Sequence, residues 1–269
     1  MIASTPGVTE VVTAATAWDP QQYLRFADER LRPAVDLLAR VALEAPARVV
    51  DLGCGAGNIT AILKRRFPAA EVTGIDGSAA MLEKARVAAP DCRFVAADIS
   101  AWTPDSAPDL IFSNAALHWV GGHDVLLPRL LSMLAPGGVL AVQMPAMHDA
   151  PLRRKQLEIA ADGPWAAVLR GHVSARDILT AGEYWDLLRP HAVALDIWET
   201  TYLHPLRGED AVVEWAAGSS LRPFLEPLTP ELQAGFRRAY ADALRPHYPR
   251  RADGTTLLPF RRLFLLAAA

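Results

Sequence analysis

The segment VVDLGCGAGN, residues 49–58, carries the clearest chemical signal in this chain. An apolar run ends in Asp51, and glycine then fills every second position. Glycine adopts left-handed backbone conformations and lets a ligand approach the peptide groups closely. Two more acids, Asp76 and Asp98, stand at the ends of the next two apolar runs. This regularity favours a binding site, with a tight strand-to-helix turn as the alternative.

The glycine spacing leaves two kinds of nucleotide cofactor open. The dinucleotide fingerprint G-x-G-x-x-G needs a third glycine where this chain has Asn58, after Gly53 and Gly55. A pyrophosphate is anionic and binds backbone N–H groups, whereas a carboxylate stabilises the α-ammonium and sulfonium groups of S-adenosylmethionine (SAM). Asp51 therefore favours SAM. Asp76 follows the glycine loop by about 20 residues, which is the sequence spacing of an acid that binds ribose hydroxyls, so it suits either cofactor.

Residues near the later strand ends complete the expected cofactor site. We expect Asp98 to accept a hydrogen bond from the adenine amino group and the backbone N–H of Ile99 to donate to a ring nitrogen. Asn114 follows the fourth strand and is expected to offer backbone groups near the cofactor. Cys54 lies inside the glycine loop, where a thiol need not be reactive.

The elements that position these residues alternate regularly. Residues 24–44 have helical periodicity, which Pro33 is expected to bend. Short apolar strands then alternate with helices five times over about 100 residues, and Ser78 is placed to cap one of these helices. The pattern predicts a parallel sheet covered on both faces, which binds ligands outside the carboxyl ends of its strands.

After Pro145 the alternation changes to long helical stretches around two further strands. Residues 149–192 and 208–248 look mainly helical, ALDIWETTYLH reads as a strand, and RRLFLLAAA closes the chain as another. These two strands are expected to pair antiparallel at the sheet edge. We predict one domain over residues 1–269, with a core of about 30–148, 193–204 and 260–269 and a helical cap of about 149–192 and 205–258.

Composition narrows the classes of protein. The chain has 269 residues, 51% hydrophobic content, a net charge of −3 and two cysteines. Nothing in this balance favours a nucleic-acid partner, and no apolar run is long enough to span a membrane. The start of the chain lacks a signal-peptide pattern, and the cysteines suit a reducing cytoplasm. No metal site is expected, and arginine pairs such as Arg261-Arg262 are expected to be mostly solvated surface.

In its successive motifs the chain resembles the class I SAM-dependent methyltransferases. VVDLGCGAGN, GIDGSAAML, AADIS, DLIFSNAALHW and LAPGGVLAVQMP are similar to their successive motifs. From about Trp18 to Ala267 it is similar to the trans-aconitate methyltransferases in particular, through WDPQQYLRFADERLRPAVDLLARV, VEWAAGSSLRPFLEPL and DGTTLLPFRRLFLLA. The resemblance implies a doubly wound α/β fold with a seven-stranded, mostly parallel, Rossmann-like sheet and a helical cap.

The resemblance also implies an activity. These enzymes transfer a methyl group from SAM to one carboxylate of a small polycarboxylic acid and form a monomethyl ester. Gly77 and Met81, in the second motif, join the cofactor-binding set. Trp18 and Tyr23 lie on the segment that in this family folds over the SAM pocket. His118 stands where the family more often has glutamine.

Methylation of a carboxylate needs orientation and local cations more than acid–base catalysis, because the acceptor is already an anion at pH 7. Arg222 is the first candidate for binding it, since an arginine fork matches a carboxylate. Tyr202 and His204 leave the sixth strand within reach of the substrate. The ring of Trp119 could pack against the sulfonium cation, and His118 could bind substrate or act as a base. For Arg222, Tyr202, His204 and Trp119, a purely structural role is the alternative.

Other functions stay open beside methylation of a polycarboxylic acid such as trans-aconitate. SAM-dependent O-, N- or C-methylation of another small molecule keeps the cofactor and changes the acceptor. An NAD-dependent oxidoreductase and a non-catalytic SAM-binding module are alternatives of other classes. The oligomeric state is not predicted.

Overall fold

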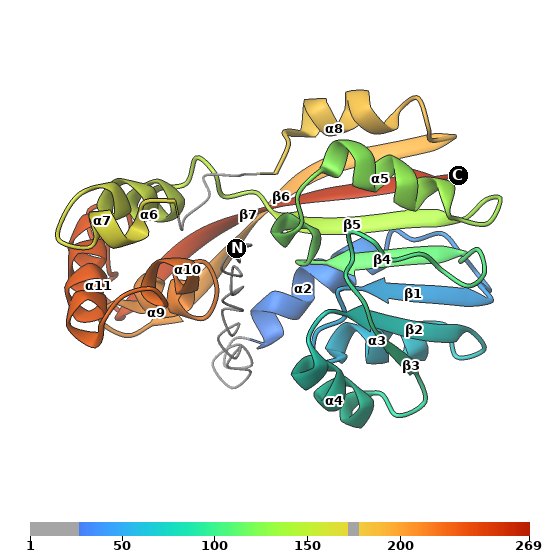
Figure 1. Ribbon diagram of the computed structural model, residues 1–269, viewed down its shortest axis with the longest axis horizontal. Coiled ribbons are helices and arrows are strands. Elements are labelled where there is room, and N and C mark those ends of the chain that lie inside the picture. Colours follow the sequence, from blue (N-terminus) through green and yellow to red (C-terminus); the bar gives the residue numbers. More distant parts are fainter. Residues whose placement is uncertain (1–26, 172–177) are drawn as a thin grey trace, which may run out of the picture.

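The computed structural model describes residues 27–171 and 178–269, which form a seven-stranded sheet with helices on both faces and a helical lobe at one end (Figure 1). The strand order is β3-β2-β1-β4-β5-β7-β6. Strands β1 to β5 are mutually parallel, and β7 runs antiparallel to both β5 and β6. The strands are β1 (Arg48–Leu52), β2 (Glu71–Asp76), β3 (Arg93–Ala96), β4 (Leu110–Asn114), β5 (Val139–Pro145), β6 (Ala194–Arg207) and β7 (Thr255–Ala268). The predicted fold class is confirmed.

Apolar side chains on both faces of the sheet hold the helices in place. On one face, α2 (Ala27–Leu38) and α3 (Asn58–Arg66) pack on β1, β4, β5 and β7, with α4 (Ala79–Ala88) beside α3. The 3₁₀ turn η1 (Leu117–Trp119), α5 (His123–Ser132) and α8 (Ala181–Leu188) cover the other face. The central strands are buried almost continuously, as parallel strands between two helical layers must be.

The two long strands β6 and β7 extend beyond the sheet and carry the helical cap (Figure 1). The cap contains α6 (Pro151–Ala161), α7 (Ala166–Leu169), α9 (Ala211–Ala217), α10 (Arg222–Leu225) and α11 (Pro230–Leu244), which share a second apolar cluster. Leu206 and Leu258, near the outer ends of the two strands, belong to that cluster. Both strands therefore run further into the cap than the predicted limits at residues 204 and 260.

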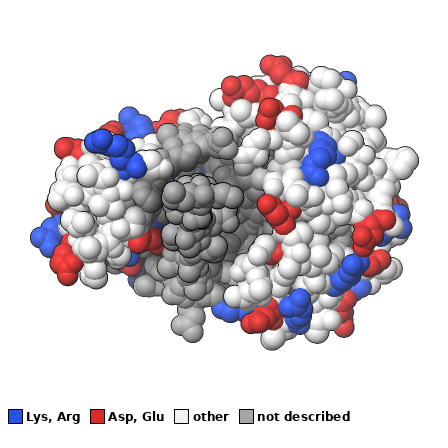
Figure 2. All heavy atoms as spheres, viewed as in Figure 1, with Lys and Arg blue, Asp and Glu red and all other residues white. Residues whose placement is uncertain are grey.

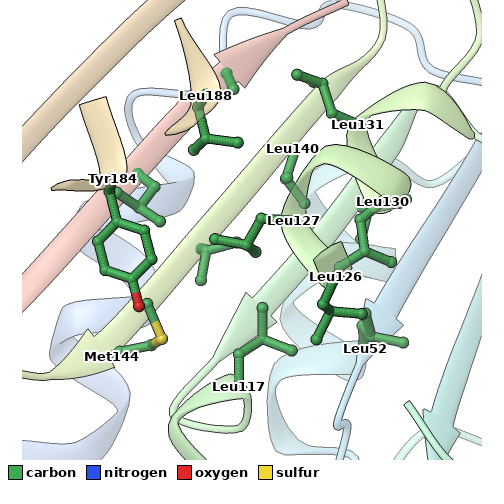
Figure 3. Close-up of a cluster of buried hydrophobic side chains, with 14 of the residues drawn as sticks. Leu52, Leu117, Leu126, Leu127, Leu130, Leu131, Leu140, Met144, Tyr184 and Leu188 are labelled. Atoms are coloured by element: carbon green, nitrogen blue, oxygen red, sulfur yellow. The ribbon is translucent and has the colours of Figure 1, made fainter. Parts of the chain in front are cut away.

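Helix α8 lies outside the cap, although the sequence grouped it with residues 149–192. Its side chains Tyr184 and Leu188 are fully buried against the sheet, together with Met144 of β5 and the leucines of α5 (Figure 3). The Tyr184 hydroxyl also lies 2.5 Å from Nδ1 of His123 at the start of α5. The polar and apolar contacts together fix α8 to the core.

The first described helix is shorter than its sequence pattern. α2 ends at Leu38 and contains Pro33, whereas helical periodicity runs to residue 44. Trp18 and Tyr23, which were expected to close the cofactor pocket, lie outside the described residues. Among the described residues, no helix is both long and apolar enough to cross a membrane. Acidic and basic side chains are interspersed over the visible face (Figure 2).

Candidate functional site

A cavity of about 420 Å³ opens at the carboxyl ends of the parallel strands. This volume lies within the range typical of small-molecule sites. One wall is the glycine loop after β1, and the opposite wall is built by β7 and the cap helix α9. The predicted residues that line it are Asp51, Gly53, Cys54, Gly55, Asn58, Asp76, Gly77, Met81, Ile99, Asn114, His118 and Trp119.

The glycine loop needs its glycines for two different reasons. Gly53 has a φ of +82°, and a Cβ there would lie 2.2 Å from the Cβ of Ala116. Gly55 has a φ of +53°, yet a Cβ would meet no described atom within 4 Å. Gly53 thus permits close packing of the loop on the β4–η1 segment, while Gly55 faces open space where a ligand can approach the backbone.

Asp51 is a buried carboxyl group in the floor of the cavity. Its residue is 1% exposed, and Oδ2 accepts a 2.6 Å hydrogen bond from the Thr60 hydroxyl. Burial raises the pKa of Asp51 to about 7, the Thr60 hydrogen bond opposes this rise, and the nearby Asp76 charge adds to it. A cationic ligand beside Asp51 would favour the ionised carboxylate, because opposite charges stabilise each other strongly where water is excluded.

The Asp76 carboxylate connects the glycine loop to the start of α4. Its Oδ2 accepts from the backbone N–H of Gly55 at 2.9 Å, and its Oδ1 accepts from that of Ser78 at 2.8 Å. Ser78 caps α4 as predicted, because its side chain accepts from the backbone N–H of Met81. The carboxylate expected to bind ribose therefore also fixes the shape of the loop around the cofactor.

Asp98 occupies a different place from the other two acids. It is exposed and does not belong to the cavity lining, although its neighbour Ile99 does. One oxygen, Oδ1, accepts from both the backbone N–H and the hydroxyl of Ser100 at 2.8 Å. These hydrogen bonds lower the pKa of Asp98, so the carboxylate is ionised at neutral pH. Its contact with adenine stays a prediction.

Two further lining residues have unusual environments. Burial, together with the charges of Asp51 and Asp76, raises the pKa of the Cys54 thiol, which keeps it protonated and unreactive. The side-chain oxygen Oδ1 of Asn114 is buried with no hydrogen-bond partner among the described residues. Ala115 follows with a φ of +53°, a conformation that costs a residue with a Cβ free energy and recurs at functional sites.

The η1 turn presents His118 and Trp119 to the cavity. Trp119 is 59% exposed, which excludes core packing and places it at the mouth. Its ring lies 4.6 Å from that of His118, centroid to centroid. Burial, with the charges of Arg262 and His123, lowers the pKa of His118 to about 3. His118 is therefore neutral at physiological pH, and its Nδ1 is buried with no partner among the described residues.

The far wall contains residues that were not expected from the sequence. Arg262 of β7 is 4% exposed and lines the cavity beside Phe260, Trp215 and Ser219. Its guanidinium carbon lies 4.4 Å from the centroid of the Phe260 ring. Arg262 is an exception to the expectation that the arginine pairs are mostly solvated surface. Residue alternation offered a signal, because Arg262 shares one strand face with Phe260 and the buried Phe264.

The remaining predicted acceptor residues lie outside the lining. Arg222 begins α10, where its guanidinium binds the Glu226 carboxylate at 2.5 Å. The Tyr202 hydroxyl donates to Oδ2 of Asp36 on α2 at 2.7 Å. His204 is buried and stacks on Trp215 with ring centroids 4.6 Å apart. The contacts of Tyr202 and His204 connect elements around the cavity, and that of Arg222 stays within the cap, so the positions of these three residues favour structural roles.

Comparisons with known proteins identify the family of this chain. A family model described as a methyltransferase domain matches residues 49–138. The chain is 51% identical over 253 residues to trans-aconitate 2-methyltransferases of Paracidovorax citrulli and Methylobacterium radiotolerans, covering 93% of this chain and 97% of each relative. It is 48% identical to the trans-aconitate 2-methyltransferase of Yersinia pestis, covering 94% of this chain and 98% of the relative.

Solved structures share the fold at low sequence identity. YcgJ from Bacillus subtilis has a TM-score of 0.59 and 15% identity, covering 88% of this chain and 98% of its own. A putative sarcosine dimethylglycine methyltransferase from Galdieria sulphuraria has a TM-score of 0.54 and 18% identity, covering 88% of this chain and 85% of its own. These likenesses bear on the fold alone.

The residues present fit SAM, which is the cofactor of this enzyme. The buried Asp51 carboxylate suits a cation, Gly55 leaves room at the loop, and the buried Asn114 oxygen offers an acceptor. The predicted identification is confirmed at the level of the family, because the identity extends over nearly the whole length of the relatives. The chain belongs to the trans-aconitate 2-methyltransferase family of class I methyltransferases.

Proposed function

We propose that this protein transfers a methyl group from SAM to one carboxylate of trans-aconitate and releases a monomethyl ester and S-adenosylhomocysteine. The observation that carries the proposal is the opposite charge at the two ends of one cavity. The Asp51 carboxyl group lies at the glycine loop, and the Arg262 guanidinium lies at the far wall. A cationic cofactor and an anionic acceptor would be bound in this order, in a chain 51% identical to enzymes named for that acceptor.

The residues of this chain would act mainly by binding and orientation. Bound SAM supplies an activated methyl group together with its own leaving group. We assign the cofactor end to Asp51, Asp76 and the glycine loop, and the acceptor end to His118 and Arg262. Holding the two reactants in line can contribute about 7–11 kcal/mol to lowering the barrier. Trp119 at the mouth is placed to limit the access of water.

The neutral state of His118 supports a carboxylate acceptor. A base with a pKa of about 3 removes protons poorly at neutral pH, whereas a carboxylate needs no deprotonation there. An amine or hydroxyl acceptor would need a stronger base in this position. The same imidazole can still hydrogen-bond an anionic substrate, so we assign His118 a binding role.

Transfer of a labelled methyl group to a panel of small di- and tricarboxylic acids tests this function. We expect trans-aconitate to be the preferred acceptor and the product to release its label in mild base, as an ester does. Arg222→Ala should keep this activity, because Arg222 pairs with Glu226 outside the cavity lining. A base-stable product, or binding of NADH in place of SAM, would contradict the proposal. We also place the reaction in the cytoplasm, an assignment supported by the free thiols of Cys54 and Cys92.

A further inference from the structure

The antiparallel course of β7 brings Arg262 to the ligand-binding edge of the sheet. Arg262 pairs with Pro145 at the end of β5 and with Thr200 of β6. The carboxyl end of β5 adjoins that of β4, where Asn114 and Ala115 line the cavity. A residue from the last strand of the chain thus reaches the same edge as the cofactor loop.

The surroundings of Arg262 suit a bound anion. Of the described residues that line the cavity, it is the sole arginine or lysine. The lining acids Asp51 and Asp76 belong to β1 and β2, which β4 and β5 separate from β7 in the sheet. Phe260 packs against the guanidinium plane and restricts its orientation. Because the side chain is almost wholly buried, its charge is weakly screened by water.

The charge of Arg262 acts on one residue of the cavity lining and on one residue beside the cavity. It contributes to the lowered pKa of His118 and opposes the raised pKa of Tyr202. Both effects are those of a cation in the space between η1 and β6. An anion placed there would meet the guanidinium and the neutral His118 together.

We infer that Arg262 binds a carboxylate of the acceptor other than the one that is methylated, and so selects acids with at least two carboxylates. The reason lies in the fork geometry, since a bidentate guanidinium engages both oxygens of one carboxylate. A carboxylate held in this way is a weak nucleophile, whereas a second carboxylate on the same molecule stays available to the methyl group. This inference rests on the proposed function and adds the residue that determines specificity.

Substitution of Arg262, with two acceptors compared, tests the inference. In Arg262→Gln we expect the KM for trans-aconitate to rise about 100-fold, as when one partner of a buried charge pair is removed. The monocarboxylate crotonate lacks the anchored group, so we expect the parent enzyme to methylate it slowly. In Arg262→Gln that rate should stay within a factor of about two, and so should the Kd for SAM. Arg262→Lys keeps the charge without the fork and should recover part of the loss.

Arg261→Gln is the matched control, because Arg261 is the next residue of β7 and binds Ala146 and Asp149 outside the cavity lining. It should keep the KM of the parent enzyme for both acids. An unchanged KM for trans-aconitate in Arg262→Gln, or an equal loss on both acids with a well-folded protein, would overturn the inference.

If the proposed function is wrong, the experiment gives a result that differs from a failure of the Arg262 inference alone. In that case the parent enzyme would methylate no acid of the panel. Calorimetric titration of trans-aconitate into the enzyme loaded with S-adenosylhomocysteine then decides the inference by itself. Binding that is lost in Arg262→Gln and kept in Arg261→Gln supports it, whereas equal binding or no binding in all three proteins overturns it.

Discussion

Asp51 illustrates how a single residue can favour binding at the expense of stability. Its carboxyl has a pKa of about 7 in the folded protein against an ordinary value of 3.8. The folded state therefore retains a proton that the unfolded state releases between about pH 4 and pH 7. As the pH rises through this window, the buried carboxyl increasingly destabilises the ligand-free protein. A cationic ligand reverses the effect by stabilising the ionised form.

The affinity for SAM should consequently depend on pH through Asp51. Ionisation strengthens attraction for the ammonium group, so the Kd should fall as the pH rises from about 6 to about 8. Asp51→Asn should remove this dependence and raise the Kd at about pH 8 by about 10- to 100-fold, the loss typical of a hydrogen bond to a charged group. Calorimetric titration across the pH range measures both effects.

Adenosine is the control ligand for this experiment, because it has no ammonium group. Its affinity should show no dependence on the state of Asp51. The ligand-free Asp51→Asn variant should also melt at a higher temperature than the parent at about pH 8, since no buried charge forms. A parallel pH dependence in the variant would assign the titration to another group.

The two ends of the site differ in how far the sequence predicts them. The cofactor residues Asp51, Gly55 and Asp76 stand in local motifs, so spacing along the chain places them together. Arg222 and Arg262 are both arginines in the second half of the chain, and only tertiary structure separates them. Strand pairing buries Arg262 in the cavity, whereas Glu226, which directly follows α10, pairs with Arg222. The i,i+4 spacing of Arg222 and Glu226 and the alternation along β7 are local signals, whereas the position of β7 beside β5 depends on the assembled sheet.

At the scale of elements, α5 holds the segment expected to bind adenine. Arg129 of α5 donates to the backbone oxygens of Trp102 and Ser100 at 2.7 Å and of Ile99 at 3.3 Å. Ile99 lines the cavity, and Asp98 immediately precedes it. A helix on one face of the sheet thereby fixes the backbone of a cofactor loop through one side chain.

Loss of the Arg129 hydrogen bonds should weaken cofactor binding selectively. In Arg129→Met we expect the KM for SAM to rise about tenfold or more, since a lost hydrogen bond to a charged group costs about 1.5–3 kcal/mol. The KM for the acceptor should change little, because the far wall is untouched. Steady-state kinetics with each substrate varied in turn separate the two effects. Arg93→Met is the control, since Arg93 pairs with Asp105 at an exposed site. Equal changes in both KM values would indicate a general loss of structure.

Periodicity predicted the strands and helices of the core well, because each is a short local pattern. The same periodicity grouped α8 with the cap, because the apolar pattern of a helix does not indicate which surface the helix packs on. Tyr184 and Leu188 pack with leucines of α5 that lie more than about 50 residues away in the chain (Figure 3). Such contacts, and the extension of β6 and β7 into the cap, depend on the assembled sheet.

At the scale of the whole molecule, the cavity lies between elements from both ends of the chain. Leu31 of α2 lines it near the start, and Arg262 near the end. The hydrogen bond between Tyr202 of β6 and Asp36 of α2 fastens these distant parts to each other across one face of the sheet. Arg32 adds a cation 5.3 Å from the centroid of the Tyr202 ring. The edge strand that supports the cap is thus tied directly to the first described helix.

This arrangement predicts that Tyr202 serves stability and not recognition of the acceptor. Tyr202→Phe should lower the free energy of unfolding by about 1–2 kcal/mol, less than a fully buried hydrogen bond to a carboxylate contributes, because the Asp36 side chain is half exposed. The KM for trans-aconitate should stay within about twofold. Urea denaturation of Tyr202→Phe, Asp36→Ala and the double variant measures the coupling between the two side chains. Because Tyr202→Phe and Asp36→Ala each remove the same hydrogen bond, the double variant should lose less stability than the sum of the two. Additive losses would show that the two groups do not stabilise each other. A large rise in the KM for trans-aconitate would instead indicate that Tyr202 takes part in binding the acceptor.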